Sequence, residues 1–272
     1  MNRLMQWVMA AALICSTTVF TSCTKDDNPV DPAKNLSEKI IGKWMQAEIN
    51  GEPVPTDIKS VYTFVSTTKA FASASKNNFT KSDSRWSVNL EYAVVIDGNN
   101  VKLTANPNES VTLTNELAIT AINDTELFCN FKHTTLRNGQ ITGYADEIRR
   151  YEKITTDYSE AVLGTWEGHV TNSEGSVYDD GETHRWEYKA DGTYVYYEKD
   201  GDDWVPYKGN TLNEYFVDGT LLCTRWIDND VENREWWEIV SIKNDVMKWK
   251  GLRANEDGTT YTATFEMTKV VE

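Results

Sequence analysis

The feature that most constrains the fold of this chain is an internal repeat. Residues 40–44 (IIGKW) recur as residues 162–166 (VLGTW), about 120 positions later. Two further short sequence segments, beginning at residues 91 and 121 in the first half, recur in the same order in the second half at nearly the same spacing. Because self-similarity at a fixed spacing indicates a duplicated structural unit, we predict one domain over residues 36–156 and a second over residues 157–272.

Both repeats have the pattern of antiparallel β-structure. Short alternating runs rich in Val, Ile, Thr, Tyr and Trp are separated by turn dipeptides such as Asp97-Gly98 and Asn138-Gly139, which are strong hairpin signals. We therefore predict an all-β chain with seven or eight strands per repeat and, at residues 36–40, at most one helical turn. A meander that closes into a barrel would remove the exposed edges of each sheet. Two tandem antiparallel meander β-barrels are the expected architecture, and two β-sandwiches are the alternative.

Each repeat opens with an apolar pair followed by Gly-x-Trp, which places Gly42 and Trp44 in the first repeat and Gly164 and Trp166 in the second. This opening, followed by a β-meander, resembles the lipocalin-like domains of bacterial lipoproteins. The resemblance implies that the tryptophan closes one end of each barrel and that a basic residue near the last strand packs on its ring. The candidates for that basic residue are Arg149 or Arg150 in the first repeat and Lys269 in the second.

The two repeats differ in charge and aromatic content. Residues 37–156 carry 13 Lys and Arg against 14 Asp and Glu, a net of −1, whereas residues 157–272 carry 11 against 25, a net of −14. Seven of the ten Trp also lie in the second repeat. Aromatic rings beside carboxylates suit a sugar ligand, although rings that alternate into a barrel interior produce the same pattern. The candidate contacts to a ligand or glycan are Trp186, Trp226, Trp236 and Trp237.

The N-terminal residues 1–22 have the features of a signal peptide, with one early Arg and an apolar stretch too short to span a bilayer comfortably. They end at residues 20–23 (FTSC), which resemble the lipobox of bacterial lipoproteins except that Phe20 replaces the usual aliphatic residue. The resemblance implies cleavage before Cys23 and acyl chains on that cysteine, which would attach the protein to a membrane.

The segment after the cysteine, residues 23–35, is polar and contains proline, so we predict a flexible tether. Within it, residues 25–27 (KDD) resemble an export signal of Gram-negative surface lipoproteins. We therefore expect a lipid-anchored protein of the outer membrane, exposed at the cell surface.

Several classes of function are disfavoured by the sequence. A net charge of −15 leaves no basic footprint for nucleic acid. The acidic turns at 179–182 and 200–203 lack the full spacing of a calcium loop, and the three His show no zinc-ligand spacing. We therefore predict no metal and no cofactor.

No catalytic motif is present either, neither Gly-x-Ser-x-Gly nor a phosphate-binding Gly-Lys-Ser/Thr loop. We expect a non-enzymatic protein that binds a small apolar or amphipathic ligand inside a barrel, although small barrels are often packed solid. The alternatives are a surface module that binds glycan or protein through the second repeat, and a structural envelope protein. Cys129 and Cys223 lie in different repeats. The two alternatives are a disulfide bridge between the repeats and two small buried hydrophobic residues.

Overall fold

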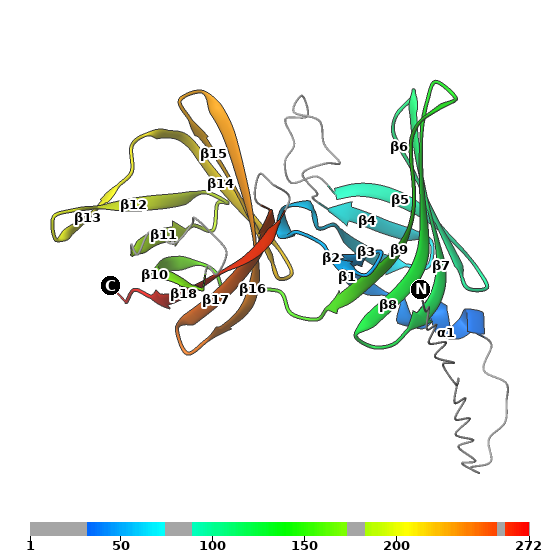
Figure 1. Ribbon diagram of the computed structural model, residues 1–272, viewed down its shortest axis with the longest axis horizontal. Helices are drawn as coiled ribbons and strands as arrows, with labels where there is room; N and C mark the ends of the chain where they lie inside the picture. The colour runs from blue at the N-terminus through cyan, green and yellow to red at the C-terminus, as the bar shows by residue number, and fades with distance from the viewer. Residues whose placement is uncertain (1–31, 74–88, 173–182, 255–258, 272) are drawn as a thin grey trace, which may run out of the picture. The chain divides into compact units, whose positions relative to one another are not determined.

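The computed structural model describes residues 32–73, 89–172, 183–254 and 259–271, which form two antiparallel β-sheets (Figure 1). The predicted all-β fold with two tandem barrels is confirmed: the first sheet is a closed barrel, and the second is a curled sheet that closes only in part. The signal peptide and Cys23 lie outside the described residues, as does the acidic turn at 179–182.

The first sheet is a nine-stranded meander. Its order is β2-β1-β3-β4-β5-β6-β7-β8-β9, and β1 also pairs with β9, which closes the barrel. Asn138 and Gly139 form the turn between its two longest neighbouring strands with φ of 51° and 77°, as a two-residue hairpin turn requires. The strands are β1 (Gly42–Ile49), β2 (Glu52–Pro53), β3 (Val61–Ser66), β4 (Lys69–Ser73), β5 (Asn89–Asp97), β6 (Asn100–Asn108), β7 (Val111–Ile122), β8 (Glu126–Arg137) and β9 (Gln140–Ile154).

The second sheet also has nine strands, but its ends do not pair in the same way. These strands are β10 (Gly164–Asn172), β11 (His184–Tyr188), β12 (Tyr194–Asp200), β13 (Asp203–Pro206), β14 (Asn210–Asp218), β15 (Leu221–Asp228), β16 (Val231–Lys243), β17 (Val246–Ala254) and β18 (Thr260–Lys269). Their order is β13-β12-β11-β10-β18-β17-β16-β15-β14, so β13 and β14 are the edges. Each sheet has one or two strands more than the sequence predicts, and the shortest are β2 and β13.

Two short helical elements accompany the sheets, α1 (Pro32–Lys39) and the 3-10 turn η1 (Thr56–Ile58). The helix α1 begins inside the segment for which the sequence predicts a tether. Proline is well suited to a first helical position, and Leu36 and Ile40, four residues apart, are both buried in the core of the first sheet. Within the described residues, no helix is long and apolar enough to cross a membrane.

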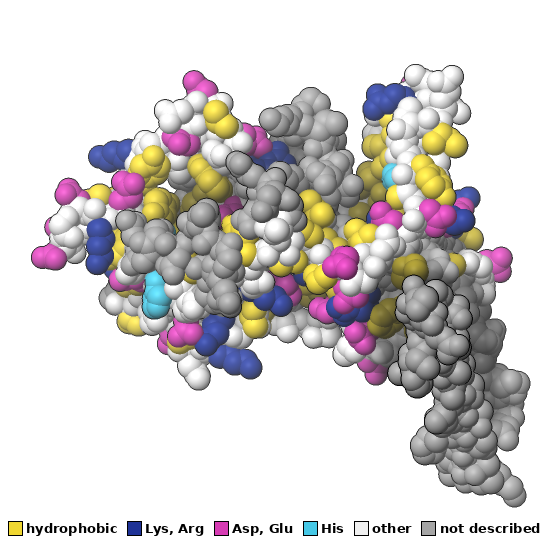
Figure 2. Space-filling view, in the orientation of Figure 1, with side chains coloured by type: hydrophobic (Ala, Val, Ile, Leu, Met, Phe, Trp, Pro, Cys, Tyr) yellow, Lys and Arg dark blue, Asp and Glu magenta, His cyan; other side chains and the backbone are white. Residues whose placement is uncertain are grey.

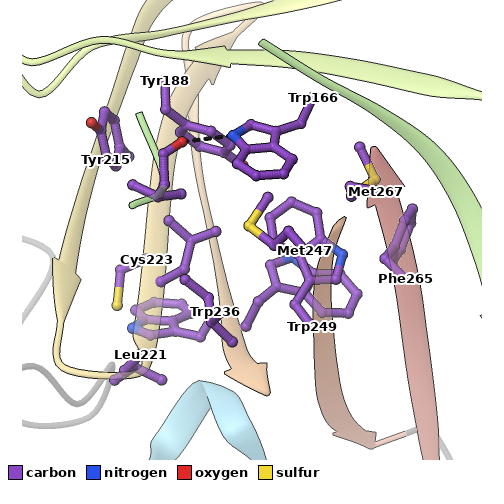
Figure 3. Packing of buried hydrophobic residues seen from close by; sticks show 14 of the residues in the cluster. Trp166, Tyr188, Tyr215, Leu221, Cys223, Trp236, Met247, Trp249, Phe265 and Met267 are labelled. Atoms are coloured by element: carbon purple, nitrogen blue, oxygen red, sulfur yellow. Dashed lines mark hydrogen bonds between the residues drawn. The ribbon is translucent and has the colours of Figure 1, made fainter. Parts of the chain in front are cut away.

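Each sheet encloses its own hydrophobic core, because alternate residues of a strand face the same side. The first core includes Trp44 and Tyr151. The second is richer in aromatic side chains, among them Trp166 and Trp249 (Figure 3). Cys129 is buried in the first core and Cys223 in the second cluster, and both are free thiols.

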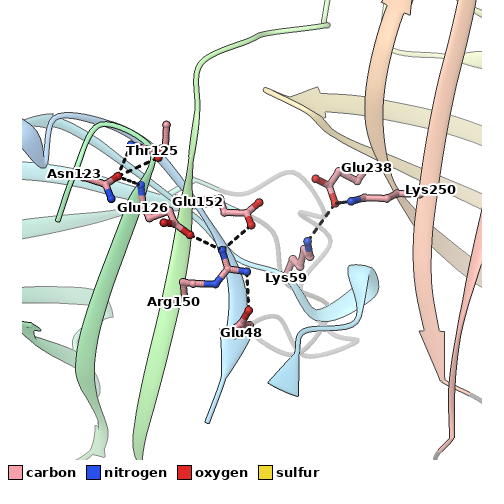
Figure 4. Close-up of polar contacts among 9 residues, drawn as sticks. All are labelled: Glu48, Lys59, Asn123, Thr125, Glu126, Arg150, Glu152, Glu238 and Lys250. Atoms are coloured by element: carbon pink, nitrogen blue, oxygen red, sulfur yellow. Dashed lines mark hydrogen bonds and ion pairs between the residues drawn. The ribbon is translucent and has the colours of Figure 1, made fainter. Parts of the chain in front are cut away.

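Polar contacts also join the first sheet to the second. Lys59 lies on the segment between η1 and β3, and its Nζ is 3.2 Å from Oε2 of Glu238 on β16 (Figure 4). The Nζ of Lys43 lies 2.6 Å from Oδ1 of Asp218 at the end of β14. Both pairs are largely shielded from solvent, with side-chain exposures of 11–31% for the lysines and 13–14% for the acids.

Candidate functional site

The Gly-x-Trp motif of the first sheet forms a packed corner. Trp44 is 1% exposed, and its Nε1 donates a hydrogen bond to the carbonyl oxygen of Ile40 at 2.7 Å. Lys153, its partner across β1 and β9, places Nζ 5.0 Å from the centre of the indole ring. Gly42 has φ of +120°, and a Cβ there would lie 3.0 Å from Cε of Lys153. The glycine therefore provides both the backbone conformation and the space that the lysine needs.

The second sheet repeats this corner residue for residue. Trp166 is 1% exposed, its Nε1 donates to the carbonyl oxygen of Val162 at 2.7 Å, and it pairs with Lys269. The Lys269 Nζ lies 5.3 Å from the ring centre, a cation–π arrangement. Gly164 has φ of +111°, and a Cβ there would lie only 2.9 Å from Cε of Lys269. The structure thus places all four predicted corner residues in two equivalent environments.

In the first sheet the basic residue over the tryptophan is Lys153, not Arg149 or Arg150. Arg149 instead lies over the ring of Phe131, with its guanidinium carbon 3.4 Å from the ring centre. Arg150 binds Glu126 and two further carboxylates (Figure 4). The register decides this, because only the residue directly opposite the tryptophan on the last strand is close enough to its ring.

The second sheet differs from the first at the seam opposite this corner. In the first sheet, β4 and β5 pair over five residues. In the second, β12 and β14 are linked by a single bridge between Thr193 and Glu214, supported by a 2.8 Å hydrogen bond from the Tyr215 amide to the Gly192 carbonyl oxygen. Beyond the bridge, β12 and β13 diverge from β14 and β15 (Figure 1). The barrel is therefore open along this seam.

A pocket of about 550 Å³ occupies the open seam, which is within the range of ~300–1,000 Å³ typical of small-molecule sites. Its floor is aromatic. Trp249 stacks on Trp237 with ring centres 5.6 Å apart and packs edge-on against Trp186 at the same separation. Tyr196 lies 5.6 Å from Trp186 and 6.0 Å from Tyr207, which continues the aromatic surface toward the mouth.

The pocket wall also carries carboxylates, Glu198 on β12, Asp228 on β15 and Glu235 on β16. Burial raises the pKa of Tyr188 well above its usual value, and the Glu235 carboxylate raises it further. The same two causes raise the pKa of Tyr194. Both phenols therefore stay neutral. Because both are close to Glu235, that acid lies at the aromatic floor of the pocket. In the space-filling view, hydrophobic and acidic side chains are both visible among the described residues of the second sheet (Figure 2).

Three of the four tryptophans proposed as ligand contacts, Trp186, Trp226 and Trp237, line this pocket. Trp236 does not, because consecutive residues of a strand face opposite sides. It is 2% exposed and packs in a cluster that also contains Met45 of β1 (Figure 3). Tyr196, Tyr207, His184 and Trp249 were not predicted from the sequence, although the alternation of aromatics along residues 184–188 and 194–198 is a signal for two of them, His184 and Tyr196.

Two buried indole donors, Nε1 of Trp236 and Nε1 of Trp249, have no hydrogen-bond partner within the described residues. Only Trp249 lines the pocket. A buried donor without a partner costs about 1–3 kcal/mol, and because this Nε1 has essentially no accessible surface, it is not a contact for a molecule in the pocket.

Within the described ranges, no group of three or more His, Cys, Asp and Glu side chains is arranged to hold a metal ion. The acidic residues 200–203 form the tight turn between β12 and β13, where Gly201 has φ of +64°.

No family model matches the chain, and no curated protein sequence does. Among solved structures, it is similar to a protein of unknown function from the DUF3598 family of Nostoc punctiforme, with 11% identity and a TM-score of 0.24, over 89% of this chain and 99% of that one. It is also similar to a double-substituted transferrin binding protein B, a vaccine antigen from Haemophilus parasuis, with 8% identity and a TM-score of 0.21, over 79% and 54% of the two chains. These likenesses are too distant to carry an argument about function.

Proposed function

We propose that this chain is a non-catalytic, membrane-anchored binding protein that holds a small apolar or amphipathic ligand in the pocket of its second sheet. The observation that carries the proposal is the open seam between β12 and β14, with its aromatic pocket of about 550 Å³. Aromatic surface gives affinity for apolar groups, and the carboxylates supply a few polar contacts. The first sheet is closed along the equivalent seam, so we assign binding to the second sheet.

The test is a titration of residues 24–272 with the neutral fluorescent probe N-phenyl-1-naphthylamine. We expect saturable binding of one probe per chain and weaker binding in Trp226→Ala, because Trp226 lines the pocket. The matched control is Trp204→Ala: this tryptophan lies on β13 of the same sheet, with the Arg185 guanidinium over its ring at 4.7 Å. Equal probe affinity in both variants, or no saturable binding to the wild type, would refute the assignment.

Anchoring at the outer membrane through acyl chains on Cys23 is a separate part of the proposal, supported by the sequence pattern at residues 20–27. Metabolic labelling with an alkyne fatty acid should label the wild type and not Cys23→Ser. The labelled protein should fractionate with outer membranes and be digested by protease added to intact Gram-negative cells. A labelled Cys23→Ser protein would contradict the assignment of the anchor.

Glycan binding is the second candidate function, and the half-exposed Trp226 beside Asp228 at the strand end favours it. An indole can stack on a sugar ring while a carboxylate accepts its hydroxyl hydrogen bonds. A glycan array probed with wild type and Trp226→Ala distinguishes the two functions: retention of a specific glycan by the wild type alone supports glycan binding. Hydrolysis of a retained glycan would contradict the proposal that the protein is not an enzyme.

A further inference from the structure

Three strands of the second sheet share a pattern that ordinary core packing does not require. On β12, β15 and β16, an aromatic residue and a carboxylate stand two positions apart, and all six side chains line the pocket. Residues two apart on a strand face the same side, so each strand presents a ring and an acid together. The three pairs are Tyr196 with Glu198, Trp226 with Asp228, and Trp237 with Glu235.

The charge of the pocket is correspondingly one-sided. Its described lining contains three carboxylates and no Lys or Arg. The arginines of these strands belong to the opposite face: Arg225 pairs with Glu214 and Glu232, and Arg234 also binds Glu232. Strand alternation thus separates the cations from the pocket and leaves the acids in it.

This pattern is not a property of the fold, because the first sheet lacks it at the equivalent positions. The strand registers fix the correspondence, since Trp44 pairs with Tyr62 as Trp166 pairs with Trp186. At the position of Glu235 the first sheet has a neutral amide, Asn115, whose Nδ2 donates to the Tyr62 hydroxyl at 2.9 Å. The first-sheet counterparts of Tyr196, Trp226, Glu235 and Trp237 are Ala72, Ala105, Asn115 and Leu117.

From these observations we infer that the ligand is an organic cation, an alkylammonium or quaternary ammonium compound. This inference rests on the proposed function of the pocket and specifies its ligand class. The electron-rich faces of Trp and Tyr attract a positively charged ammonium, and carboxylates at the same wall add Coulombic attraction in a partly desolvated site. An anion of the same shape would be repelled by the three carboxylates of the pocket.

Three six-carbon probes of different charge test the inference by isothermal titration calorimetry on residues 24–272: hexyltrimethylammonium, hexan-1-ol and hexanesulfonate. We expect the cation to bind at least about tenfold more tightly than the alcohol and the sulfonate to show no binding. In Glu235→Gln, the affinity for the cation should fall by about five- to tenfold, while the affinity for the alcohol stays unchanged. Asp228→Asn, at the mouth, provides a second variant should Glu235→Gln fail to fold.

The matched control is Glu266→Gln, which changes the net charge equally from the other face of the sheet. Glu266 lies on β18 with its side chain 43% exposed, paired to Lys248, so the affinity for the cation should change by less than about twofold. Equal binding of cation and alcohol, or an unchanged cation affinity in both acid variants, overturns the inference. If N-phenyl-1-naphthylamine still binds in that case, the proposed function stands; if no probe binds, both fail.

Discussion

Replacement of Gly164 by alanine tests the reasoning about the repeated corner most directly. The alanine would have to keep the backbone φ of +111° that Gly164 has. Its Cβ would lie 2.9 Å from Cε of Lys269. The backbone strain of a side chain in this region costs roughly 1–3 kcal/mol. Displacement of the lysine from the Trp166 ring adds about 0.5–1 kcal/mol of lost cation–π attraction. We therefore expect Gly164→Ala to lower the free energy of unfolding of the protein by about 1.5–4 kcal/mol.

Urea unfolding followed by tryptophan fluorescence is a suitable assay, because seven of the ten Trp lie in residues 157–272 and their signal reports mainly on that domain. Gly201→Ala is the control. Its φ is +64°, also positive, but a Cβ there would meet nothing within 4 Å. It should cost only the left-handed conformation itself, about 1–2 kcal/mol.

A double-mutant cycle with Lys269→Ala separates the two contributions. Without the lysine stem, the cost of Gly164→Ala should decrease by about 0.5–1 kcal/mol, because only the backbone strain remains. A cost equal to that of Gly201→Ala, with no dependence on the Lys269 background, would refute the claim that the glycine makes room for the lysine.

Three further predictions concern the described core and surface. Burial raises the pKa of Cys129 to about 12 and that of Cys223 well above its usual value, so iodoacetamide should modify neither thiol in the native protein and both in denaturant, as read by mass spectrometry. Burial lowers the pKa of His133, so the folded state holds that proton less readily than the unfolded chain, and stability is lost as the pH falls through about 6.5. The urea midpoint of His133→Gln should therefore decrease less between about pH 7 and 5 than that of the wild type. An identical decrease in both proteins would contradict this prediction. Arg150, 20% exposed, contacts three carboxylates, whereas Lys132, 54% exposed, pairs with one. In the same urea assay, Arg150→Met should therefore lower the free energy of unfolding by about 1–3 kcal/mol. Lys132→Met should lower it by less than about 1 kcal/mol.

The fold was predictable because its signals are local and repeated. Turn dipeptides such as Asn138-Gly139 mark the ends of alternating runs, and the alternation of apolar residues assigns one face of each strand to a core. The repeated Gly-x-Trp opening before both meanders also favoured two similar sheets. The helix α1 is longer than the one turn predicted at residues 36–40, because two buried residues, Leu36 and Ile40, are too few for a helical period to be recognised.

The details of the site depend on strand register, which composition does not determine. A shift of one residue exchanges the faces of a strand, so Trp236 and Trp237 looked equivalent in the sequence although only Trp237 lines the pocket. The same limit explains the assignment of Arg149 or Arg150 to the Trp44 ring, where the residue opposite is Lys153. The pocket itself depends on one bridge where the first sheet has a five-residue ladder, a difference that no local sequence signal reveals.

The two sheets are alike at one corner and differ at the opposite seam, where the proposed binding pocket lies. The Gly-x-Trp corner is the same in both sheets, down to the glycine that accommodates Lys153 in one and Lys269 in the other. The opposite seam is not the same: the first sheet has alanines at the positions of Tyr194 and Tyr196 and pairs β4 with β5, whereas the two tyrosines line a pocket in the second. Since burying bulky rings inside a closed small barrel would overpack it, the aromatic residues and the open seam belong together. The excess of acidic residues falls in the same half of the chain, and the three carboxylates of the pocket support the proposal of a cationic ligand.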